Sequence, residues 1–159
     1  MTESSTERTP KGPLDGPFLD KCYEEAMGLI HAASRYLQGP GKSERAALPD
    51  PLGAVFTGES LRMTTRLMQA VAWLMTQRAA AAGEITLEEA LAPDQRLGGR
   101  EVCLAPPLPG SEGLPPTLTE MMEESRRIYD RIARLEEQLL APEATENPVH
   151  QMLSRLDEA

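Results

Sequence analysis

The sequence predicts an all-α protein, a three-helix bundle with long connections rich in proline and glycine. Apolar residues recur at helical spacing in three long segments, and no segment of useful length alternates apolar and polar residues as a strand would. The 14 prolines and 12 glycines lie mostly outside those segments. We expect a disordered N-terminus over residues 1–16, a single bundle domain over 17–140, and a flexible acidic tail over 141–159.

The first helix is predicted over residues 17–38. Asp15 can cap its start, and Pro17 fits its first turn. The Gly-Pro-Gly run at 39–41 ends it, because glycine adopts the left-handed turn and proline blocks continuation. Residues 39–56 are interpreted as a connection. The apolar face of this helix comprises Phe18, Cys22, Ala26, Leu29, Ala33 and Tyr36.

The second helix is predicted to begin at Thr57 or Ser60, to run to about Ala82, and to stop at Gly83. Apolar residues cover more than half of its circumference, so it is expected to be the central helix.

One line along the second helix mixes charged, amide and aromatic side chains: Arg62, Arg66, Gln69 and Trp73. In one interpretation the arginine stems cover a buried seam and Trp73 belongs to the core. In the other the line binds a partner protein, because Arg and Trp are favoured interface anchors.

Two capping-box patterns follow. The one at 86–89 opens a short helix that Pro93 ends, and the one at 117–120 opens the third long helix, which Pro142 ends. The connection at 93–116 is long enough to suggest function or disorder.

The third long helix carries an unbroken heptad seam: Leu118, Met121, Ser125, Ile128, Ile132, Leu135 and Leu139. It fits an intramolecular core or a coiled-coil dimer. Three helices cannot easily bury both this seam and the broad apolar face of the second helix, so a homodimer is expected.

Charge limits the classes of partner. The net charge is −9, with 25 acidic and 16 basic residues, whereas nucleic-acid binding needs a basic face. Anionic membranes are disfavoured for the same reason. Basic or apolar partners fit better. A helical transcriptional co-regulator or nucleic-acid-binding protein using the arginines of the second helix is the alternative.

The sequence contains no recognisable catalytic or cofactor motif. The two histidines, His31 and His150, lack metal-ligand spacing, and no glycine-rich phosphate loop occurs. We therefore predict no enzyme, no metal and no cofactor. Cys22 and Cys103 are isolated and are expected to be free thiols. With no secretory signal and no membrane-spanning run, the predicted location is cytoplasmic.

The C-terminal tail contains a short amphipathic patch: Val149, Met152, Leu153 and Leu156. It could fold on binding a partner, or form a loosely docked or disordered terminus.

Two segments, EAMGLIHAASRYL at 25–37 and ESLRMTTRLMQAVAWL at 59–74, resemble the alphaproteobacterial RcdA family. The pairs Gln77-Arg78 and Gly83-Glu84 and the segment 100–107 fit as well, and the resemblance spans roughly residues 18–140.

RcdA is the regulator of CtrA degradation. The resemblance implies a dimeric, non-catalytic adaptor that delivers cell-cycle transcriptional regulators of the CtrA type to the ClpXP protease. A response-regulator-like protein would prime the protease, and the adaptor could be concentrated at a cell pole. No motif of the family assigns contacts to single residues, so none is carried over.

Overall fold

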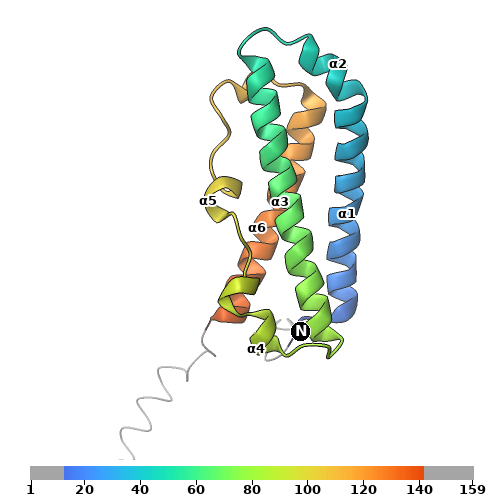
Figure 1. Cartoon of the computed structure of the whole chain (residues 1–159), viewed down its shortest axis with the longest axis vertical. Helices are drawn as coiled ribbons and strands as arrows, with labels where there is room; N and C mark the ends of the chain where they lie inside the picture. The colour runs from blue at the N-terminus through green and yellow to red at the C-terminus, as the bar shows by residue number, and fades with distance from the viewer. Residues whose placement is uncertain (1–12, 142–159) are drawn as a thin grey trace, which may run out of the picture.

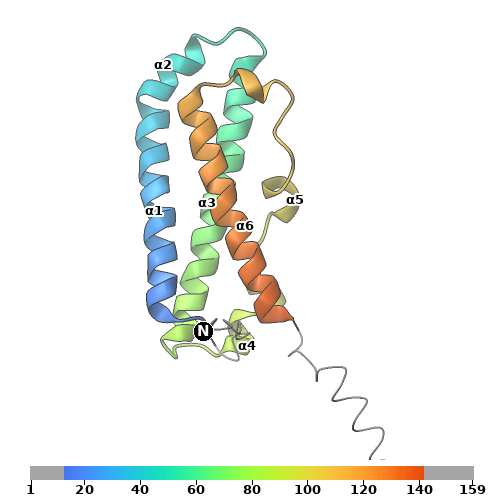
Figure 2. The same cartoon turned by 180° about the vertical axis from the view of Figure 1, so that it is seen from behind.

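The computed structural model describes residues 13–141 and confirms the all-α prediction: this part of the chain contains helices and no strand. Three long helices, α1 (Gly16–Gln38), α3 (Leu52–Ala81) and α6 (Pro116–Leu140), lie side by side (Figures 1 and 2). The connections hold three short helices, α2 (Pro40–Ala46), α4 (Leu87–Ala90) and α5 (Arg100–Cys103), and two 3-10 turns, η1 (Pro93–Gln95) and η2 (Ser111–Gly113).

Some predictions lie outside the described residues. These are the disorder of residues 1–12, the flexible acidic tail from residue 142 onward, and the patch formed by Val149, Met152, Leu153 and Leu156.

Helix α1 begins one residue earlier than predicted and ends where predicted, but Gly39, with φ of −116°, does not adopt the predicted left-handed turn. The Asp15 carboxylate accepts a hydrogen bond from the backbone N–H of Phe18 at 3.4 Å, which caps the helix. The interpretation of Pro40 was incomplete, because this proline also starts α2, where a missing N–H has no cost. Gly41 is required there: a Cβ at this position would lie 2.7 Å from the carbonyl oxygen of Tyr36.

Helix α3 is central and packs against both α1 and α6, but it begins earlier than predicted. Thr57 and Ser60 are not caps. Their hydroxyls donate to the carbonyls four residues back, those of Gly53 and Phe56, at 3.2 and 2.7 Å, which is how such residues are accommodated inside a helix. The predicted glycine stop is confirmed, because Gly83 adopts the left-handed conformation with φ of 75°.

Of the two predicted capping boxes, one is confirmed and one is wrong. The Thr86 hydroxyl accepts from the backbone N–H of Glu89 at 3.1 Å, and the Glu89 carboxylate accepts from that of Thr86 at 3.4 Å. Helix α6 instead starts at Pro116 without a side-chain cap, so Thr117 lies within its first turn. Proline at the helix start removes one donor that a cap would otherwise have to bond.

The heptad seam of α6 packs within the chain. Leu118, Ser125, Ile128 and Ile132 are buried, while Met121, Leu135 and Leu139 are partly buried against the same core. None of the described helices is long and apolar enough to cross a membrane.

Candidate functional site

The segment 97–108, which we call the strap, runs along α3 and α6 and carries α5 (Figures 1 and 2). Its backbone is held at one end by two side chains. The Gln69 side-chain oxygen accepts from the N–H of Gly98 at 3.2 Å, and the Tyr129 hydroxyl donates to the carbonyl of Gly98 at 2.7 Å. A Cβ on Gly98 would lie 2.9 Å from that Gln69 oxygen, so a larger residue would require the end of the Gln69 side chain to shift.

Three guanidinium groups bind the carbonyl oxygens of four consecutive strap residues, 103–106, at the C-terminal end of α5. Arg66 Nε donates to Cys103 at 2.8 Å; Arg126 donates to Leu104 and Ala105 at 2.9 and 3.0 Å; Arg62 donates to Ala105 and Pro106 at 3.3 and 2.7 Å. Carbonyls at a helix end lack partners within the helix and carry partial negative charge, so cationic donors suit them.

Arg66 is the most deeply buried of the three, with 3% of its surface exposed. Its Nη1 also donates to the Met122 carbonyl at 3.4 Å and to Ser125 Oγ at 3.3 Å. Burial lowers the pKa of this guanidinium, and the nearby cations of Arg126 and Arg62 lower it further. Ser125, the only polar member of the heptad seam, therefore has a partner within the core.

Glu59 bonds the C-terminal end of the strap, at Leu108. It is fully buried, and its Oε1 accepts from the backbone N–H of Leu108 at 3.1 Å and lies 3.4 Å from Arg62 Nη1. Its second oxygen, Oε2, is buried without a hydrogen-bond partner among the described residues.

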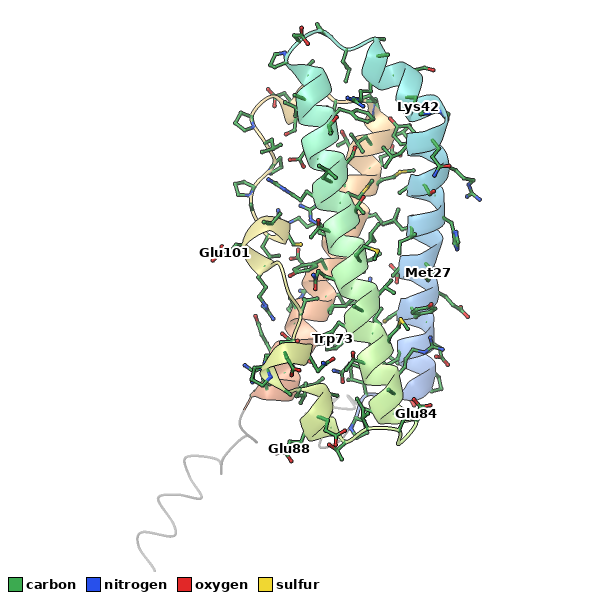
Figure 3. The ribbon with its side chains drawn as sticks, in the orientation of Figure 1. Met27, Lys42, Trp73, Glu84, Glu88 and Glu101 are labelled. Carbon is green, nitrogen blue, oxygen red and sulfur yellow. The ribbon has the colours of Figure 1, made fainter. Side chains whose placement is uncertain are left out.

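Glu136 on α6 bonds the N-terminal end of the strap, at Leu97. Its Oε2 accepts from Trp73 Nε1 at 2.7 Å and from the backbone N–H of Leu97 at 2.8 Å, and its Oε1 pairs with Arg100 at 2.9 Å. Trp73, labelled on α3 in Figure 3, is 2% exposed. These donors offset the cost of burying the carboxyl group.

The four residues of the predicted partner-binding line thus meet at the strap. Arg66 and Trp73 are buried and Gln69 is half-buried, while 11% of the Arg62 side chain is exposed. Arg62, Arg66 and Gln69 bond strap backbone groups, and Trp73 lies in the core, bonded to Glu136. A contact between this line and a partner stays a prediction.

Exposed apolar residues lie on another face of α3. Leu61, Met68 and Met75 are 64%, 61% and 56% exposed, and they follow one another at intervals of seven residues. Seven residues span two helical turns, so the three side chains form one stripe. We call it the α3 stripe.

Neither predicted free thiol has formed a disulfide: Cys22 and Cys103 are both free and buried, and burial raises the pKa of the Cys103 thiol. Within residues 13–141, no group of three or more histidine, cysteine, aspartate or glutamate side chains is placed to hold a metal ion.

Comparison with known proteins identifies the family of this chain. Residues 13–159 match the model of a family described as protein of unknown function, DUF1465. The chain belongs to this family. The crystal structure of RcdA from Caulobacter crescentus CB15 is similar at 30% sequence identity with a TM-score of 0.60, covering 76% of this chain and 89% of RcdA. No curated protein matches significantly.

The chain is therefore an RcdA-like protein, as the segments at 25–37 and 59–74 predicted. The resemblance assigned no role to single residues, whereas the structure shows which of them bond the strap. Sequence reasoning selected Arg62, Arg66, Gln69 and Trp73 but not the carboxylates that bond the strap.

Glu59, Glu136 and Arg126 were missed. Glu59 lies one turn before Arg62 on the apolar side of the second helix, and Glu136 lies four residues after Ile132 on the third. A single carboxylate at a core-facing position was the available signal, because such a group requires a buried donor.

Proposed function

We propose that this RcdA-like protein is a non-catalytic adaptor that delivers transcription-factor cargo of the CtrA type to the ClpXP protease. A response-regulator-like protein would prime the protease, and the complex would act in the cytoplasm, with concentration at a cell pole as the family resemblance implies. The similarity to RcdA, at 30% identity over 76% of the chain, is the observation that carries the proposal.

The chemistry of the strap site supports a scaffold role. Its charged side chains bond backbone groups of the same chain: Arg66 and Arg126 bond carbonyls, and Glu136 bonds an N–H. Groups held in this way stiffen a surface and fix its shape. The strap site would therefore act as a scaffold that keeps a binding surface in one shape.

The same contacts disfavour the alternative of a nucleic-acid-binding co-regulator. Arg62 and Arg66 would have to neutralise phosphates, but both donate to strap carbonyls. The net charge of −9 adds general repulsion. Protein partners are favoured on both grounds.

A homodimer through the α3 stripe is part of the proposal. Leu61, Met68 and Met75 are evenly spaced about Met68. Two antiparallel copies of α3 would therefore place Met68 against Met68 and Leu61 against Met75 around one twofold axis. The small residues Thr65 and Ala72 lie between these positions and allow close approach.

Reconstituted degradation tests the adaptor role. Purified ClpXP, the priming protein and a CtrA-type cargo are incubated with and without this protein, and loss of cargo is followed on gels. We expect faster loss only when both the adaptor and the priming protein are present. A cargo that ClpXP degrades without any priming factor serves as the control, and its rate should not change. Equal rates with and without the adaptor, for each cargo tried, would overturn the proposal.

A further inference from the structure

A hollow of about 470 Å³ lies between α3, α6 and the chain that follows the strap. Its lining includes the apolar side chains of Leu108, Pro109 and Met122, and three glutamates, Glu59, Glu112 and Glu123. The hollow therefore combines an apolar wall with carboxylates contributed by three separate segments of the chain.

Glu59 is the buried part of this lining. The N–H of Leu108 and the guanidinium of Arg62 both lie at Oε1, and Oε2 has no partner among residues 13–141. A buried carboxylate oxygen without a donor costs free energy. A donor that entered the hollow and reached this oxygen would remove that cost.

Two arginines also line the hollow, and each donates to backbone carbonyl oxygens of the chain. Arg126 directs both terminal nitrogens to the carbonyls of Leu104 and Ala105, and Arg66 directs Nε and Nη1 to carbonyls of the strap and α6.

The carboxylates on the rim are free by comparison. Glu112 and Glu123 are exposed, and neither forms an ion pair within the described part of the chain. The hydrogen-bonding capacity left in the hollow is therefore mainly that of acidic acceptors. A cationic group fits it, and the charge of −9 on the whole chain favours the approach of such a group.

We propose that this hollow binds a lysine or arginine side chain of a partner polypeptide. The aliphatic stem packs against Leu108 and Met122, and the charged head reaches Glu59 Oε2 and the rim carboxylates. Long basic side chains have this division between an apolar stem and a polar head, so one residue would use both parts of the lining.

Titration with amino-acid probes tests the proposal. Isotope-labelled protein is titrated with N-acetylarginine amide, and its backbone amides are followed by NMR. N-acetylnorleucine amide, which has the stem without the charge, is the matched probe. We expect saturable shifts at Leu108, Ser111 and Thr119 with the arginine probe into the millimolar range, and no saturable shifts there with the norleucine probe.

The double variant E112Q/E123Q removes two rim charges at exposed positions, so its fold should be unchanged. Its affinity for the arginine probe should fall about fivefold, the size expected for losing ion pairs at a partly exposed site. The control variant E24Q/E84Q removes the same charge from exposed positions elsewhere, with Glu84 at the lower end of Figure 3, and should bind like the wild type.

Three results would overturn the proposal: no saturable shift with the arginine probe, equal affinities for both double variants, or tighter binding of N-acetylglutamate amide at the same residues. The titration needs neither protease nor cargo. Its failure would leave the adaptor proposal standing, and a failed degradation assay would leave this pocket proposal standing.

Discussion

Trp73 and Glu136 are joined by a hydrogen bond of 2.7 Å between the indole Nε1 and the carboxylate Oε2, and both residues are 2% exposed. This bond links α3 to α6 at a point where the same carboxylate oxygen also accepts the backbone N–H of Leu97. One buried carboxylate thus connects two long helices and the strap.

The change Glu136→Gln should destabilise the protein by about 1–3 kcal/mol. A glutamine keeps the size but has one acceptor oxygen in place of two and turns an N–H₂ group toward one of the donors, so at least one buried donor loses its partner. Urea unfolding followed by circular dichroism measures the effect. The control is Glu137→Gln, where 66% of the side chain is exposed, and it should change stability by less than about 0.5 kcal/mol. Equal effects of the two variants would show that the buried network does not stabilise the fold.

Arg66→Met should cost about 1–3 kcal/mol, because it removes the buried cationic donor to the Cys103 carbonyl; the Met122 carbonyl keeps Ser125 as a donor. Arg62→Met should cost about 3–5 kcal/mol, since it leaves the fully buried Glu59 carboxylate without its ion-pair partner. Chemical denaturation gives both values. Hydrogen exchange should also speed up at strap amides in Arg66→Met. A variant of wild-type stability would argue against this role for Arg66.

The segments that the sequence predicts well are those with local signals. The Asp15 cap, the Thr86 capping box and the glycine stop at Gly83 each depend on residues within one turn of one another. Such interactions can be inferred without knowing the fold, and so can the broad apolar face of α3.

The strap site depends on contacts far apart in the sequence, and so it was predicted only in part. Arg66 lies 37 residues from Cys103 and 59 from Ser125, and Trp73 lies 63 from Glu136. The spacing of apolar residues along the chain does not predict contacts between residues so far apart. The sequence could indicate that Arg66 and Trp73 were unusual on an apolar helix, but their partners required the fold. The early start of α3 was missed because Pro51 and Gly53 read as connection residues.

Stability should fall as pH rises above about 10, partly through Tyr129. Burial raises the pKa of Tyr129 above its ordinary value, so above pH 10 the unfolded chain loses this proton more readily than the folded one. The unfolded state then binds fewer protons, and the free energy of unfolding decreases with pH. In Tyr129→Phe, the free energy of unfolding should fall less steeply above pH 10 than in the wild type. At neutral pH the variant should be less stable by about 1 kcal/mol, because it loses the hydrogen bond to Gly98. Parallel pH dependences for the variant and the wild type would contradict the assignment.

Met68→Glu should convert the proposed homodimer to a monomer. Met68 is the midpoint of the α3 stripe, so an antiparallel pair would bring two carboxylates together at the twofold axis, where repulsion and the cost of desolvation act twice. The side chain is 61% exposed, and the monomer should therefore keep its fold and helical content. Sedimentation equilibrium measures the mass. Val102→Glu is the matched control, because Val102 is 53% exposed and lies on α5 rather than on α3; this variant should stay dimeric. A wild-type protein that is monomeric at micromolar concentration, or a Met68→Glu variant that remains a dimer, would exclude the stripe as the interface.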